Sequence, residues 1–137
     1  MAMSFSTTLR NTLIDAITSA LNAGSGTTGA TLAVRSGSRP ANVGTAATGT
    51  LLGTLTCSAT CAPAAASGTT TFNAITQDSS ADATGTATWG RAFDKSGTAI
   101  FDFNISTTGA ELNLSNTSIT AGGPISVSSM VLTDGNP

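Results

Sequence analysis

Two cysteines, Cys57 and Cys61, are the residues whose type and spacing point most directly to chemistry. They lack the histidines or the second cysteine pair that would complete a zinc site. An extended chain would hold them too far apart for a disulfide, which needs Cα atoms within about 7 Å, whereas a turn at 58–60 would bring them together. A protein made in a cytoplasm normally keeps its thiols free. The sequence therefore leaves two states open for Cys57 and Cys61, a disulfide and a pair of free thiols.

Asp78 and Asp82 form a second candidate site, because a loop with two carboxylates can bind a calcium ion weakly. A calcium-binding loop also supplies further oxygen ligands and a closing glutamate at a defined spacing. Residues 78–82 provide neither of these. We therefore predict no metal site and expect the two carboxylates to be solvated.

Catalysis has few residues to draw on, because the chain has no histidine, no tyrosine, one lysine and one glutamate. A nucleophile needs a positioned base, but the acidic residues mostly fall at turns or on the polar side of an alternating strand. They are Asp15, Asp78, Asp82, Asp94, Asp102, Glu111 and Asp134. Alternation places Asp102 and Glu111 on solvent-facing sides of their strands. The sequence thus predicts no catalytic residue, no cofactor site and no enzymatic activity.

Charge and hydropathy exclude further classes of protein. Only 9% of the residues are charged, and the net charge is −2. The five cations are scattered and form no basic patch, which argues against a nucleic acid partner. They are Arg10, Arg35, Arg39, Arg91 and Lys95. No stretch approaches the ~18 apolar residues of a membrane span, and the start lacks a secretory signal, so we expect synthesis in the cytoplasm and no membrane association.

Small residues dominate the composition: 26 Thr, 22 Ala, 17 Ser and 15 Gly make up more than half of the chain. An alanine-rich core stabilises less than a leucine core, at roughly 25 cal/mol per Å² of buried apolar surface. Association between copies would add the missing burial, so we expect a homo-oligomer. A length of 137 residues suits a single domain, with an N-terminal segment and helix at 1–24 and a β domain at 25–137.

Apolar residues near the N-terminus recur every four positions and predict an amphipathic helix over residues 7–22. Its apolar stripe comprises Phe5, Leu9, Leu13, Ile17 and Leu21. Ser4, Ser6 or Thr7 can cap the start of the helix. Gly24 follows its end, where glycine is favoured. We expect the stripe to pack against the chain's own sheet or against a neighbouring subunit.

Seven short alternating segments follow, separated by Gly, Ser, Asn and Pro. They span residues 30–36, 49–57, 69–76, 84–94, 97–105, 109–115 and 125–133. This spacing predicts a mainly β fold, an antiparallel β-sandwich or jelly-roll-like domain preceded by the one helix. Asp94 and Gly97 bracket a turn that predicts a hairpin between the fourth and fifth segments. In the last segment the apolar parity changes near Ser128 and Ser129, which predicts a β-bulge.

Aromatic residues of this hairpin are predicted to share one face. Alternation groups Trp89 with Phe93 in one strand and Phe101 with Phe103 in the next. We therefore expect all four side chains on the inner face of the hairpin. This grouping argues against the exposed aromatic platform of a carbohydrate-binding module.

Two segments without predicted regular structure, 37–48 and 57–68, are each about twelve residues long. Loops of this length are often functional, so we expect both to make contacts with a partner.

Several segments together resemble a known family. They are TLRNTLIDAITSALNAG at 8–24, RSGSRP at 35–40, AATGTLLGTL at 46–55, GTATWGRAFDKSGT at 85–98 and SITAGGPISVSS at 118–129. Over nearly the whole chain, this pattern resembles that of small structural proteins of tailed bacteriophages and prophages. The Cys57 and Cys61 pair departs from it.

The resemblance implies a non-enzymatic virion protein, in the first place a capsid decoration or cement protein on the outside of a phage head. Such proteins clamp neighbouring major capsid subunits, often as trimers or dimers. We therefore expect the major capsid protein and further copies of the chain as partners, with a trimer favoured. Loops 37–48 and 57–68 are expected to contact the capsid, and helix 7–22 to pack within or between decoration subunits. The alternatives are a tail, fibre or baseplate component and, third, a carbohydrate-binding module.

Overall fold

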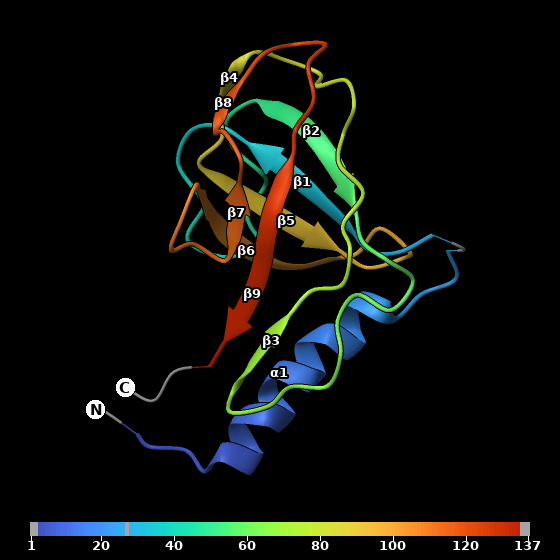
Figure 1. Ribbon diagram of the computed structural model, residues 1–137, viewed down its shortest axis with the longest axis vertical. Helices are drawn as coiled ribbons and strands as arrows, with labels where there is room; N and C mark the ends of the chain where they lie inside the picture. Colours follow the sequence, from blue (N-terminus) through green and yellow to red (C-terminus); the bar gives the residue numbers. More distant parts are fainter. Residues whose placement is uncertain (1–2, 27, 135–137) are drawn as a thin grey trace.

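The computed structural model describes residues 3–26 and 28–134 and shows a mainly β protein with one N-terminal helix. Its elements are α1 (Thr7–Asn22), β1 (Thr31–Arg35), β2 (Leu51–Thr56), β3 (Thr69–Thr71), β4 (Gly85–Thr86), β5 (Trp89–Phe93), β6 (Ala99–Ser106), β7 (Leu112–Leu114), β8 (Ser118–Ile119) and β9 (Val127–Thr133). Figure 1 shows α1 lying across one end of a curled, mostly antiparallel sheet. The predicted fold class is confirmed.

Helix α1 has the predicted bounds because its ends carry the expected capping residues. The side chain of Ser6 accepts a hydrogen bond of 3.2 Å from the Leu9 backbone N–H, which satisfies one of the free donors of the first turn. Just beyond the last turn, Gly24 has a φ of +111°, a conformation that glycine adopts without a steric penalty.

The main sheet has seven strands in the order β2-β1-β5-β6-β7-β9-β3, and β6 and β7 form its parallel pair. Its two edges are joined by residues 72–78, which we call the connector. Thr76 pairs with Thr56, the last residue of β2, and Asp78 pairs with Ile125 just before β9. The sheet therefore curls until the connector bridges its edge strands, which shields backbone groups that an open edge would expose.

Strand β3 is shorter than the predicted segment 69–76. After Phe72, whose N–H bonds to the Met130 carbonyl, the chain leaves β9. Asn73 then donates to the Cys61 carbonyl, and Thr76 to the Thr56 carbonyl. The connector stays extended, but its partners change too often for a continuous strand.

The predicted hairpin is formed by β5 and β6. The Asp94 carboxylate accepts hydrogen bonds from the N–H groups of Ser96 and Thr98, and Gly97 has a φ of +86°. The segment 84–94 is split, however, into β4 and β5. Ala87 and Thr88 donate to Thr117 and Arg35, two different neighbours, and this interrupts the strand between them.

The aromatic residues of the hairpin do not share one face, so that prediction is wrong. Phe103 lies opposite Gly90, and Trp89 lies opposite Asn104. Because directly paired residues project to the same side of a sheet, Trp89 and Phe103 lie on opposite faces. Both are nonetheless buried, at 1% exposure each, because β5 is covered on both faces.

The prediction that Asp102 faces solvent is also wrong. Its carboxylate is paired with Arg91 on the face of Trp89, with bonds of 2.6 and 2.9 Å. The side chains of Arg91 and Asp102 are 7% and 3% exposed, and the guanidinium lies 5.6 Å from the Trp89 ring centroid. The hydrogen bond to Asp102 raises the pKa of Arg91. Alternation correctly places Asp102 on the opposite side of the sheet from Phe103. It does not show that this side of the sheet is also covered.

The predicted bulge is present in β9. Asn113 pairs with Ser129 and Leu114 pairs with Val127, which leaves Ser128 as the extra residue. The bulge lets Ile125 and Met130 both point into one apolar cluster, to which α1 also contributes Ile14 and Leu21.

Candidate functional site

The cysteines are free thiols in the interior of the protein. Cys57 is 4% exposed and Cys61 is 0% exposed. The Cys61 thiol lies 3.6 Å from the Thr18 carbonyl of α1. Burial, with a smaller contribution from Cys61, raises the pKa of Cys57 to about 12, and burial also raises the pKa of Cys61. Of the two states that the sequence left open, the structure has the thiols.

We expect these thiols to react with DTNB at about pH 8 only as fast as the protein unfolds, because the thiolate is the reactive species. The folded state holds the Cys57 proton more tightly than the unfolded state, whose pKa is the ordinary 9.0. This contribution to stability is complete below that pH and is lost as the pH rises toward about 12.

The measurement is thiol release in native buffer and in urea, with thermal melts across the alkaline range. Cys57→Ala is the control, and its melting temperature should fall less steeply above about pH 9 than that of the wild type. Rapid labelling of the native protein at neutral pH would contradict the burial of both thiols.

Asp78 has a structural role in this fold. One carboxylate oxygen accepts the Thr54 N–H of β2, and the other accepts the Ser80 N–H, each at 3.0 Å. The side chain therefore ties the connector to β2. Within residues 3–26 and 28–134, three or more His, Cys, Asp or Glu side chains do not gather anywhere as a set of metal ligands.

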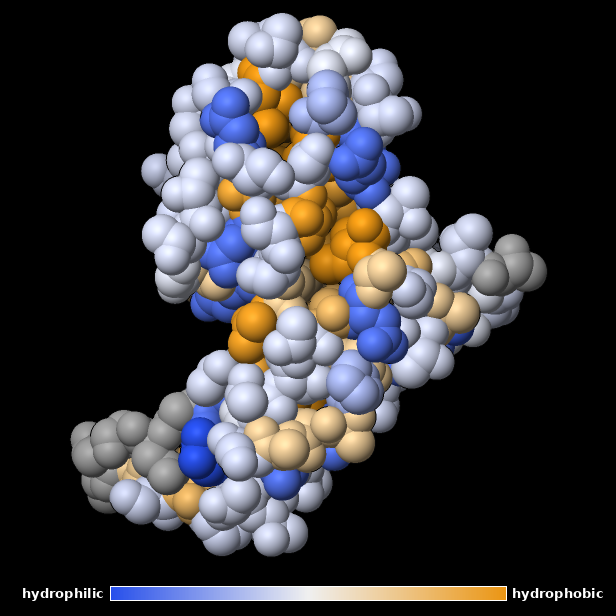
Figure 2. Space-filling view, in the orientation of Figure 1, coloured by the Kyte–Doolittle hydropathy of each residue, from blue (hydrophilic) through white to orange (hydrophobic). Residues whose placement is uncertain are grey.

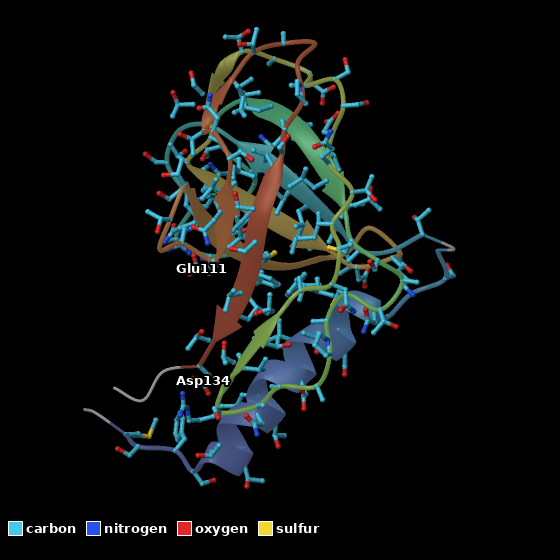
Figure 3. The ribbon with its side chains drawn as sticks, in the orientation of Figure 1. Glu111 and Asp134 are labelled. Carbon is cyan, nitrogen blue, oxygen red and sulfur yellow. The ribbon has the colours of Figure 1, made fainter. Side chains whose placement is uncertain are left out.

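Glu111 and Asp134 lie in separate surroundings, Glu111 beside β7 and Asp134 beyond the end of β9 (Figure 3). The Glu111 carboxylate accepts the Asn104 N–H at 3.1 Å. Asp134 lies at the start of α1, where its backbone carbonyl accepts a 2.6 Å bond from Arg10. One buried oxygen of the Asp134 carboxylate lacks a hydrogen-bond partner among the described residues. Glu111 and Asp134 therefore do not form a pair of neighbouring carboxylates that could act together in acid–base chemistry.

The loop 57–68, predicted to be a contact loop, is fixed along α1. Its backbone N–H groups donate to three polar side chains of the helix: Gly68 to Asn11 at 2.8 Å, Ala65 to Asp15 at 2.8 Å and Cys61 to Asn22 at 2.9 Å. Together with the Cys61 thiol near Thr18, these bonds follow one face of the helix. The outward side of the loop exposes small side chains. They are Ala59, Thr60, Pro63, Ala64, Ala66 and Ser67.

This arrangement turns part of the apolar stripe of α1 toward solvent. Leu21 is buried, as expected, but Ile14 and Thr18 are the other buried residues of the helix. Leu9 and Leu13 remain 44% and 40% exposed. The expected partner surface within the chain therefore covers only one end of the stripe.

The loop 37–48 is the more open of the two predicted contact loops. Most of its side chains are exposed, and Thr88 anchors its first residue by a 2.6 Å bond to the Gly37 carbonyl. Thr45 and Asn42 stabilise its tip by bonds of 3.2 Å.

A cavity of about 260 Å³ opens between the connector and β9, and sequence reasoning missed it. We call it the slot; residues 71–75 line one side and residues 127–130 the other. Figure 2 shows hydrophobic side chains at the surface in this hollow. The sequence predicts one continuous strand over residues 69–76 and therefore no opening. The slot exists because the chain separates from β9 after Phe72.

Comparison of the chain with protein-family models, with curated proteins and with solved structures finds no match. Among the described residues, no helix has both the length and the apolar character that crossing a membrane requires.

Proposed function

We propose that the protein is a non-enzymatic structural component of a phage virion, a capsid decoration or cement protein on the outer surface of the head. One observation carries this proposal: the outward side of loop 57–68 presents small side chains from a backbone already fixed to α1. A surface that is ordered before binding loses little conformational entropy when it meets a partner. The resemblance to phage structural proteins favours a capsid as that partner.

Burial of capsid seams is the proposed mechanism. Loops 37–48 and 57–68 each contact a major capsid subunit, and many weak contacts add up over the shell. Copies of the chain associate with one another, with a trimer favoured, so that one cluster spans several capsid subunits. A tail, fibre or baseplate position would use the same surfaces on another partner. The carbohydrate-binding alternative loses its aromatic platform, since Trp89 is buried.

We expect heads assembled with this protein to carry it on their outer surface, and the protein to stay bound in moderate salt because few charges lie at the contact. Cryo-electron microscopy of heads made with and without the protein is the measurement. Ala64→Glu places a charge on the exposed face of loop 57–68 and should lower occupancy, whereas Thr107→Glu, exposed between β6 and β7, is the matched control. Bare heads would contradict the proposal, and density confined to tails would favour the tail alternative.

A further inference from the structure

The slot is a built opening in the wall of the sheet. Phe72 bonds to Met130 at one end and Ile125 bonds to Asp78 at the other, both at 2.8 Å. Between these bonds the connector turns its backbone toward residues 56–61, away from β9. The two sides are therefore held apart while both ends stay closed, so that a side chain has room to enter but a whole strand does not.

The lining of the slot is uncharged, with apolar side chains at its floor and the polar residues Thr71, Asn73, Ser128 and Ser129 among its other lining residues. Phe72 and Met130 belong to the buried core, and Ile75 and Val127 pack against that core while partly exposed. The described lining residues include no charged side chain. A dry apolar cavity of about 150 Å³ accommodates benzene, so a volume of about 260 Å³ is sufficient for a leucine side chain.

The same chain carries side chains of matching character. In the described part of the sequence the exposed large apolar residues are Met3, Leu9 and Leu13, all near the N-terminus. Leu9 and Leu13 lie one turn apart on α1, and Ala16 extends the same face. We call these three residues the ridge.

The charged residues of α1 are turned away from the ridge. Arg10 bonds to the Asp134 carbonyl, and Asp15 accepts the Ala65 N–H. Neither the ridge nor the slot would therefore bury a charge on contact, and the unfavourable desolvation of an unpaired ion is avoided. The hydrogen bonds of Asn11, Asp15 and Asn22 hold α1 against its own loop, with the ridge facing outward, so the ridge is not free to enter the slot of its own chain.

We propose that the slot binds the ridge of a second copy of this chain. The inference deepens the part of the proposed function that expects a homo-oligomer, and it names the surfaces involved. Ridge and slot are different patches, so the contact is heterologous and repeats head to tail from copy to copy, and it closes into a ring when the rotation between copies closes.

Complementary charges test this pairing in purified protein. Leu13→Glu places a negative charge on the ridge, and Ser128→Lys places a positive charge on the exposed rim of the slot. By sedimentation velocity, each variant alone should weaken self-association by at least about tenfold, which corresponds to ~1.4 kcal/mol. The double variant with Leu13→Glu and Ser128→Lys in one chain should recover it, because the glutamate of each copy meets the lysine of the next copy at every contact.

Ser19→Glu is the matched control, since it adds the same charge to an exposed position of α1 away from the ridge. It should associate like the wild type, and circular dichroism should show that all variants are folded. A monomeric wild type, a Leu13→Glu variant that associates normally, or a double variant that stays dissociated would each overturn the inference. Loss of head binding in Leu13→Glu with a monomeric wild type would also overturn it and would assign the ridge to the capsid. Head binding is assayed separately, so failure of self-association leaves the capsid proposal standing.

Discussion

Phe103→Ala should lower the free energy of unfolding by about 3–5 kcal/mol, the range for truncation of a buried phenylalanine. The Phe103 side chain is 1% exposed and packs over Gly90 on the neighbouring strand. A Cβ atom at Gly90 would lie 2.5 Å from the Phe103 ring, so the glycine provides the space that the ring fills. Removing the ring leaves a cavity over Gly90 on the core side of the sheet, which the paired strands cannot close.

Urea denaturation monitored by circular dichroism is the appropriate measurement. Phe101→Ala is the matched control, because Phe101 has its ring 5.8 Å from that of Phe103 but remains partly exposed. Its loss should be clearly smaller than that of Phe103→Ala. Equal losses, or an unchanged midpoint for Phe103→Ala, would contradict the pairing of Phe103 with Gly90.

Asp102→Ala should destabilise the protein by about 3 kcal/mol, because it leaves the Arg91 guanidinium covered and without its carboxylate. We take the lower end of the range for buried pairs, since the Trp89 ring stays beside the guanidinium and keeps a cation–π contact after the carboxylate is lost. The bonds that disappear are the two from Arg91, at 2.6 and 2.9 Å.

The double variant Arg91→Met with Asp102→Leu separates the loss of the pair from the isolation of one charge. Replacing both partners by apolar side chains of similar size is often close to neutral. We therefore expect the double variant to be more stable than Asp102→Ala by thermal melting. A double variant as unstable as the single one would show that packing under the pair, and not the unpaired charge, determines the loss.

Local signals in the sequence were sufficient for several elements. The bounds of α1 follow from its apolar period and from Ser6 and Gly24 at its ends. The β5–β6 turn follows from Asp94 and Gly97, and the bulge from the parity change around Ser128. In each case the residues that specify the feature lie within a few positions of it.

The wrong predictions concern which side of a strand or helix is covered by another part of the chain. Alternation places Trp89 and Phe93 on one face with Phe101 and Phe103, but a bulge between Ala92 and Phe93 shifts the register of β5 and β6 and puts Trp89 on the opposite face from Phe103. The polar residues Asn11, Asp15 and Asn22 lie outside the apolar stripe of α1, yet they do not face open solvent. The three side chains face loop 57–68 because the backbone N–H groups of that loop are buried against the helix and need hydrogen-bond acceptors there. The need for these acceptors arises in a segment some fifty residues away, so the local pattern of the helix does not reveal it.

Thermal rupture of decorated and bare heads tests the capsid proposal most directly. Shells lacking the protein should still assemble, since a small surface clamp does not set shell geometry, but they should open at a lower temperature. Each bound copy adds a modest interface free energy, and many copies must be broken together before the shell opens. We expect decorated heads to rupture at a higher temperature than bare heads in both low and high salt, because contacts with few charges are weakly screened. Equal rupture temperatures for the two kinds of head would contradict the account.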